Sequence, residues 1–289
     1  MNKRKIVFFL ILTQLACIIF SQNQVDEKIK IVYKGRKIEF QDSNTGEIKR
    51  IFDIEENNPF RNEPFQMNKN GQSYDMTGVT LADFLPNISQ YDKNIIARLN
   101  RSINYASISG TPYRKANNYV SITYDFVVWN NNDSSVFTKS KIVILNNKGE
   151  IIHTIDPNYS VARQAITDDG KFLCVAYTNT DRALTEEKGF GVKIYSLINN
   201  TICCDKWIDR SIVSIFVKYD MCLIESDKSD KINGKSTNYL IFNSIDKLLY
   251  SKTFKWETRC KLREITSEGF VFNDRIEYFE SDFNLEKLK

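Results

Sequence analysis

Histidine is almost absent from this sequence: His153 is the single one among 289 residues. Metal sites built from several histidines are therefore excluded, and a Ser-His-Asp triad would depend on this one side chain. His153 lies in the segment Ile151–Ile155, which is typical of an outer strand, and no nucleophile motif surrounds it. Glycine and proline are also scarce, with 11 and 5 residues, which excludes collagen-like and low-complexity chains.

An excess of charge is missing too, once the first residues are set aside. Lys3, Arg4 and Lys5 are three of the 40 basic residues, and the other 37 nearly balance 36 acidic residues. A nucleic-acid partner would call for a basic surplus that neutralises phosphates. The sequence therefore predicts no nucleic-acid partner.

Cysteines are few and irregularly spaced. Neither CxxC nor Cys/His spacing occurs, so we expect no zinc site and no other cofactor. Cys174 and Cys222 lie in apolar strand-like segments, and the adjacent Cys203 and Cys204 point to opposite faces of a predicted strand. We interpret all four as packing residues in a protein that folds without needing a disulfide, with one bridge left open.

The N-terminus has the layout of a secretory signal peptide. Lys3, Arg4 and Lys5 precede an apolar run from Ile6 to Phe20, and Ser21 offers a small residue before a polar stretch. We expect cleavage after Ser21 and a secreted or periplasmic protein with no later membrane-spanning segment. The alternatives are an uncleaved membrane anchor and a lipid anchor on Cys17.

After residue 25 the chain alternates short apolar segments with tight polar turns, the signature of β-hairpins. Helical periodicity is weak except at Leu81–Leu85 and Lys93–Leu99. The predicted hairpins join Lys141–Leu145 to Glu150–Ile155, Ala165–Thr167 to Lys171–Tyr177, Val192–Leu197 to Thr201–Trp207, Ile212–Val217 to Met221–Glu225, and Tyr239–Phe242 to Leu248–Phe254.

The hairpins recur with a period of about fifty residues, which is the period of propeller blades. One type of turn falls near Gly71, Asn118, Gly170, Asp220 and Gly269. A second type of hairpin ends its first strand at Phe40, Leu145, Tyr195, Phe242 and Phe279, which requires a weak copy near residue 95. Two interleaved hairpins per period predict a four-stranded repeating unit.

Two stretches also resemble the repeat motifs of bacterial exported β-propeller proteins. They are Asp168–Leu173, and Val192–Leu197 with the Asn199-Asn200 turn that follows. The resemblance covers most of residues 26–289 through turn spacing and strand pattern, and it includes no catalytic motif. It implies an all-β fold and no particular activity.

We therefore expect a signal peptide over residues 1–21 and one β-propeller domain over residues 26–289. The length suits about six four-stranded blades at about fifty residues per blade. The N-terminal strands around Lys30–Tyr33 and Lys37–Gln41 are expected to close the ring. The rival architecture is a pair of β-sandwiches.

Three longer polar segments are predicted to be connections on one face of the disc, where binding residues concentrate. They are Trp129–Ser140, Thr178–Phe190 and Ser226–Asn238. Side chains of the types that dominate interface energetics lie in or near them. The candidate binding residues are Trp129, Tyr159, Arg182, Trp207, Arg210, Trp256 and Arg259. The competing interpretation is that the three tryptophans seal the seams between blades.

Two functions are compatible with these patterns. The first is an exported binding or scaffold protein that recognises a protein or glycan partner on the face with the long connections. The second is a secreted hydrolase or lyase that acts on an extracellular polymer through a pair of carboxyl groups. The single histidine and the lack of a catalytic motif favour the first.

Overall fold

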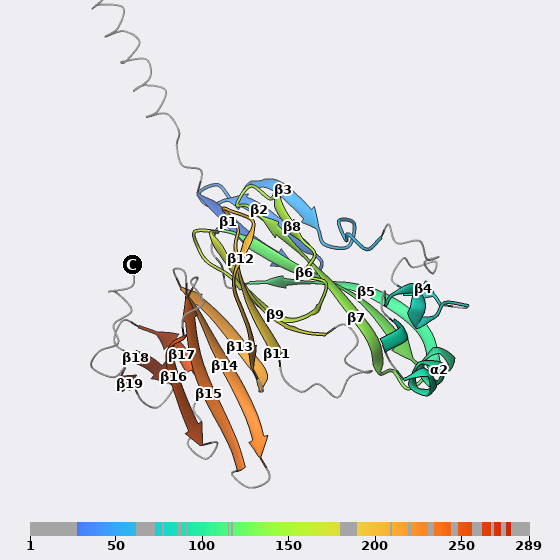
Figure 1. The fold of residues 1–289 in the computed structure, drawn as a ribbon. Helices are drawn as coiled ribbons and strands as arrows, with labels where there is room; N and C mark the ends of the chain where they lie inside the picture. The colour runs from blue at the N-terminus through green and yellow to red at the C-terminus, as the bar shows by residue number, and fades with distance from the viewer. Residues whose placement is uncertain are drawn as a thin grey trace, which may run out of the picture.

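The protein is all-β over the part of the chain that this computed structural model describes (Figure 1). The predicted signal peptide, at residues 1–21, the turn positions Gly71 and Asp220, and the predicted strand end Phe279 lie outside the described residues. The described residues are 28–61, 73–76, 78–85, 88–90, 92–114, 116, 118–179, 190–208, 210–218, 221–230, 234–243, 248–255, 262–266, 269–272 and 276–278.

The first two sheets come from the N-terminal half, and each is an antiparallel meander. The three-stranded sheet contains β1 (Ile29–Lys34), β2 (Lys37–Asp42) and β3 (Ile48–Asp53). The five-stranded sheet contains β4 (Ser73–Asp75), β5 (Ile103–Tyr113), β6 (Val120–Asn130), β7 (Ser135–Leu145) and β8 (Ile151–Ile155).

The C-terminal half repeats the same hairpin pattern and is coloured from yellow-green to red in Figure 1. One four-stranded sheet contains β9 (Ser160–Ile166), β10 (Phe172–Thr178), β11 (Phe190–Ser196) and β12 (Thr201–Ile208). The next contains β13 (Ser211–Lys218), β14 (Met221–Asp230), β15 (Gly234–Asn243) and β16 (Leu248–Lys255). A three-stranded sheet follows, with β17 (Leu262–Ile265), β18 (Gly269–Phe272) and β19 (Ile276–Tyr278).

Each hairpin predicted after residue 140 is present as a pair of antiparallel strands, and two of the described turns show why. Gly170 has φ +69°, which an L side chain rarely adopts. In the same turn the hydroxyl of Thr167 donates to Asp169 Oδ1 at 2.7 Å. At the β7–β8 turn the Asn146 side chain accepts the N–H groups of Lys148 and Glu150.

Two of the three predicted long connections are wrong, because most of their residues belong to strands. Trp129 pairs with Ser135 in the β6–β7 hairpin, and its turn is residues 131–134. Most of Ser226–Asn238 lies in β14 and β15, which stay paired as far as Asp230 and Gly234. Polar side chains on these strands gave the segments a loop-like composition. Most of Thr178–Phe190 lies outside the described residues.

The other N-terminal expectations are met in part. The predicted helical segments are a 3-10 helix, η1 (Leu81–Asp83), and a helix, α2 (Lys93–Ser102), capped by Asp92; a second short 3-10 helix, η2, spans Ile88–Gln90. The weak strand copy expected near residue 95 is therefore wrong. β1, β2 and β3 pair only with one another among the described strands, which form five sheets, so the expected ring closure is not seen in the described chain.

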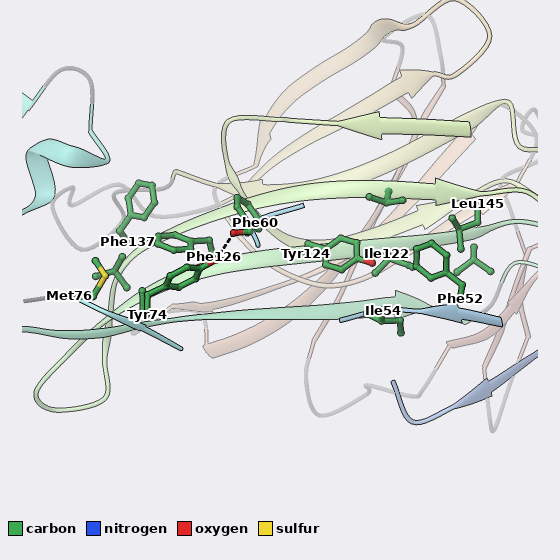
Figure 2. Packing of buried hydrophobic residues seen from close by; sticks show 14 of the residues in the cluster. Phe52, Ile54, Phe60, Tyr74, Met76, Ile122, Tyr124, Phe126, Phe137 and Leu145 are labelled. Carbon is green, nitrogen blue, oxygen red and sulfur yellow. Dashed lines mark hydrogen bonds between the residues drawn. The ribbon is translucent and has the colours of Figure 1, made fainter. Parts of the chain in front are cut away.

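Apolar faces of neighbouring sheets pack against each other in three buried clusters. In the first, Phe40 and Phe52 from the N-terminal sheet meet Ile122, Tyr124 and other residues of β6 (Figure 2). The second lies between the β9–β12 and β13–β16 sheets, and the third joins the other face of the β9–β12 sheet to β7. Sheets stacked face to face bury both surfaces of the central ones.

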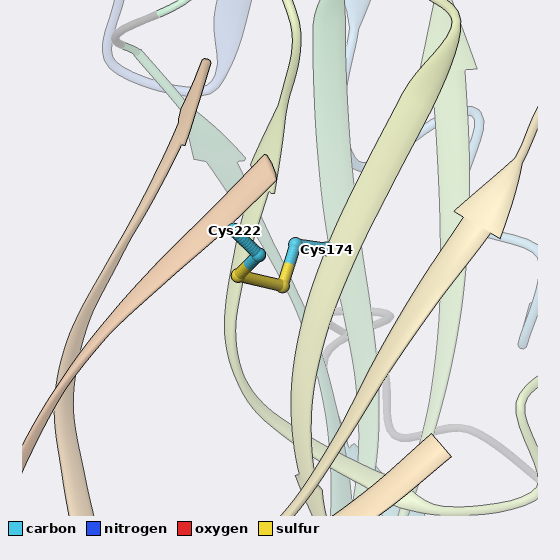
Figure 3. Close-up of a disulfide and its surroundings, with 2 residues drawn as sticks. All are labelled: Cys174 and Cys222. Carbon is cyan, nitrogen blue, oxygen red and sulfur yellow. A yellow bond between two sulfur atoms is a disulfide. The ribbon is translucent and has the colours of Figure 1, made fainter. Parts of the chain in front are cut away.

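A disulfide crosses the second cluster and corrects the interpretation of its cysteines. Cys174 of β10 and Cys222 of β14 are both fully buried, as expected of packing residues, but they are bonded to each other (Figure 3). Their separation of 48 residues is about one repeat, so equivalent strands of successive sheets bring the two sulfur atoms together. Within the described part of the chain, neither Cys203 nor Cys204 forms a disulfide.

Candidate functional site

The structure describes four of the seven predicted binding residues. Arg182, Trp256 and Arg259 lie outside the described residues. Trp129 is half-buried: its ring stacks on Tyr105 of β5, and its indole N–H donates to the hydroxyl of Ser107 at 2.8 Å. Trp129 therefore packs on its own sheet.

Arg210 is also tied into the fold. It is half-buried between β12 and β13, and its Nη1 donates to the hydroxyl of Ser236 on β15 at 3.3 Å. This hydrogen bond links the connection between two sheets to a strand of the second one. The remaining two residues, Tyr159 and Trp207, come together.

Tyr159 and Trp207 meet at one end of the β9–β12 sheet through Tyr177. The ring centroid of Tyr177 lies 4.2 Å from that of Tyr159 and 6.4 Å from that of Trp207, the latter in an edge contact. Strand register explains this contact, because Tyr177 pairs with Gly191 and Gly191 pairs with Trp207. A Cβ atom on residue 191 would collide with the ring of Tyr177, so the ring can occupy this position only because residue 191 is a glycine.

A buried cation lies beneath these rings. Lys193 is two residues further along β11, on the same face, and only 5% exposed. Its Nζ lies 4.0 Å from the ring centroid of Tyr159 and 4.7 Å from that of Tyr177, which is cation–π distance. It also lies 3.5 Å from Oδ2 of Asp205, the cross-strand neighbour of Lys193 on β12.

Asp205 completes the cluster through its second oxygen. The hydroxyl of Tyr177 donates to Asp205 Oδ1 at 2.7 Å. Burial, and then this carboxylate, raise the pKa of Tyr177, so the phenol stays protonated and keeps its role as donor. Burial, Asp205 and Tyr159 likewise raise the pKa of Tyr195 to about 12. We call Tyr159, Tyr177, Lys193, Asp205 and Trp207 the aromatic site.

The outer edge of the aromatic site is open to solvent. Trp207 is 43% exposed, although the residues behind it are fixed by hydrogen bonds and cation–π contacts. A tryptophan beside such fixed neighbours presents a flat apolar face and an N–H donor. Such a surface can stack on a sugar ring or receive an apolar side chain of a protein.

Sequence reasoning missed three of the five residues. Tyr177, Lys193 and Asp205 lie in segments that were correctly predicted as strands, and their roles depend on cross-strand register. One sequence feature could have indicated the site: Lys193 lies in the apolar strand Val192–Leu197, and a charge that is buried in such a strand requires a partner. Within the part of the chain that the structure describes, no three His, Cys, Asp or Glu side chains gather as they would around a metal ion.

No family model matches the sequence, and no curated protein matches it. Similar solved structures include the β-propeller domain of the Trilobed protease from Pyrococcus furiosus, with 20% identity, 56% of this chain aligned and a TM-score of 0.38. They also include the Pyrococcus horikoshii acylaminoacyl peptidase, with 16% identity, 56% of this chain aligned and a TM-score of 0.37.

The alignments cover 47% and 27% of those two chains, less than half of either. TM-scores below 0.5 are too low for a function to be transferred from these proteins. The resemblance to bacterial exported β-propeller repeat proteins therefore stays a prediction.

Proposed function

We propose that this chain is an exported binding protein, built as a β-propeller of about six blades, that recognises a protein or glycan partner at the aromatic site. The observation that carries the proposal is the exposure of Trp207 above a fixed set of neighbours. Tryptophan and tyrosine supply most of the energy at many interfaces, and a prearranged site loses little entropy on binding.

Export is the second part of the proposal. The signal-like N-terminus supports it, and so does the disulfide between Cys174 and Cys222, since disulfides persist in oxidising compartments. Among the described helices, none is both long and apolar enough to cross a membrane. The intact mass of the exported chain tests cleavage after Ser21, and a mature N-terminus at a lipidated Cys17 would contradict it.

The binding proposal is tested by affinity capture with the tagged full chain. The bait is incubated with the extracellular or periplasmic fraction of the organism that encodes it, and captured proteins are quantified by mass spectrometry. A glycan array is probed in parallel. Trp207→Ala is compared with Ile202→Ala, a control on the same strand whose side chain is 52% exposed.

We expect the wild type and the Ile202→Ala variant to capture the same partner. Capture by Trp207→Ala should fall by at least about tenfold, as for an interface hot spot. Equal capture by Trp207→Ala would show that the binding surface lies elsewhere.

A further inference from the structure

A separate cleft lies between two sheets, and it is lined by residues other than those of the aromatic site. It has a volume of about 340 Å³ and is bordered by the end of β5, the middle of β6 and the start of β9. Cavities of this size are at the lower end of the range for small-molecule sites. None of the predicted binding residues is among the described residues that line it.

A carboxyl group is fixed in this cleft by a hydrogen bond across the β6–β7 hairpin. The hydroxyl of Ser140 donates to Oδ1 of Asp125 at 2.5 Å, and Ser140 is fully buried. The same hydroxyl accepts the backbone N–H of Val161 on β9 at 2.8 Å. Ser140 therefore sets both the rotamer of Asp125 and the position of the opposite wall.

An amide oxygen in the same cleft has no hydrogen-bond partner. Gln164 of β9 is only 8% exposed, and its Nε2 donates to the backbone oxygen of Ser121 at 3.3 Å. Its Oε1 is buried and unpartnered among the described residues. An unsatisfied buried acceptor is costly, and in native proteins it commonly marks a place for a donor from outside the chain.

The charged residues that line the cleft balance each other, and the remaining lining residues are neutral. Arg163 is the one basic residue among the described residues that line the cleft, and Asp125 is the one acidic residue, so their formal charges cancel. The guanidinium of Arg163 donates to the backbone oxygens of Val213 and Ala162, at 3.1 Å and 2.7 Å. Tyr113 and the neighbouring proline, Pro112, supply a flat, mostly apolar wall.

We propose that this cleft binds a neutral, hydroxyl-rich ligand, specifically a single pyranose unit of a sugar. The ligand's hydroxyl groups would donate to the carboxyl group of Asp125 and, after the amide of Gln164 turns toward the cleft, to Gln164 Oε1, and the sugar ring would lie along Tyr113. A cationic ligand would have to approach the guanidinium of Arg163, and an anionic ligand would have to approach Asp125. The balanced charges favour a ligand with no net charge.

The described cleft is arranged to bind a sugar and not to cleave one through two carboxyl groups. Glycoside hydrolysis requires a pair of carboxyl groups about 5–10 Å apart. Asp125 is the single acidic side chain among the described residues of the cleft. The inference thus goes beyond the proposed capture of a partner at the aromatic site and does not depend on it.

The experiment measures binding of four neutral sugars to the full chain: glucose, galactose, mannose and N-acetylglucosamine. Saturation-transfer NMR detects binding, and titration gives the dissociation constant, which we expect in the millimolar range for at least one sugar. Gln164→Leu removes the free acceptor and keeps the size of the side chain, and Asp125→Asn removes the charged acceptor. Each should weaken binding by about tenfold or more.

The matched control is Asp227→Asn. Asp227 also accepts a hydroxyl group across its own hairpin, from Thr237 at 2.6 Å, but it does not line the described cleft. Asp227→Asn should keep sugar binding. Loss of sugar binding in Trp207→Ala but not in Gln164→Leu would place the sugar at the aromatic site and overturn this inference, so the two proposals can fail separately. Binding of none of the sugars, or equal binding by the Gln164→Leu variant, would overturn the inference. Binding of choline in preference to every sugar would overturn it in favour of a cation site.

Discussion

At the scale of single residues, the position of Tyr177 depends on the missing side chain of Gly191. Substitution Gly191→Ala would push a Cβ atom into the ring. We expect a loss of about 1–3 kcal/mol in the free energy of unfolding, as in other overpacked sites. In the Tyr177→Ala background the added methyl group fits, so the same substitution should cost much less. Denaturant unfolding of the four proteins measures this coupling, and additive effects would contradict it.

Asp125 is expected to make stability depend on pH. Burial raises its pKa above the ordinary value of 3.8, and the hydrogen bond from Ser140 lowers it by less. The folded state therefore favours the protonated carboxyl group, and its stability falls as the pH rises from about 3.8 through the native pKa. The amide of Asp125→Asn does not ionise, so the variant should gain stability relative to the wild type over this range.

Urea unfolding of both proteins from about pH 3 to about pH 7 measures the difference. A difference that stays constant over the whole range would contradict the proposed burial of a protonatable carboxyl group. Asp227→Asn again serves as the comparison, since its carboxyl group lies outside the described cleft.

The sequence analysis identified Tyr159 and Trp207 of the aromatic site, but it did not identify the residues that connect them. Tyr159 and Trp207 stood out because they are large aromatic residues beside predicted turns. Lys193 and Asp205 are a cross-strand pair, and neither carries a local signal for that pairing. Register between strands depends on bulges, such as the one between Ile194 and Tyr195, which composition does not reveal.

At the scale of elements, the β14–β15 hairpin shows why polar strands were mistaken for loops. Thr237 is fully buried, and its hydroxyl donates to Asp227 across the ladder at 2.6 Å. The residues around Thr237 are mostly polar, which is a composition typical of loops. They are nevertheless part of two paired antiparallel strands. The predicted turns at residues 146–149, 168–170 and 199–200 are present, because Asn, Asp and Gly have specific local roles there.

Thr237→Val tests the strand assignment. The valine keeps the branched shape and removes the hydroxyl donor, so we expect a loss of about 1–3 kcal/mol in the free energy of unfolding. Thr201→Val, at an exposed position of β12, should change it by less than about 0.5 kcal/mol. Equal, small effects in both variants would indicate that residues 226–238 behave as a solvated loop.

At the scale of the whole molecule, the disulfide joins two successive sheets through their second strands. We expect reduction, or the double substitution Cys174→Ala with Cys222→Ala, to lower the free energy of unfolding by about 2–4 kcal/mol. This reverses the expectation that the protein folds without needing a disulfide. Unfolding with and without reductant measures the effect, and an unchanged midpoint would show that the bond is not formed in solution.

The period of about fifty residues predicted the repeated meanders, because each repeat carries its own turns and apolar strands. How the sheets associate could not be predicted in the same way. The N-terminal strands pack on β6 through Phe40 and Phe52, a contact between segments about eighty residues apart that leaves no periodic trace in the sequence. Blade number and ring closure depend on such long-range packing, and they stay predictions.

The central claim is that Trp207 binds a partner and does not seal a seam between sheets. The most direct measurement compares the wild type and Trp207→Ala for two quantities, the free energy of unfolding and the dissociation constant for the captured partner. We predict that stability changes by less than about 1 kcal/mol, because Trp207 is 43% exposed, and that affinity falls by at least about tenfold. A large loss of stability, with affinity per folded molecule unchanged, would contradict the claim.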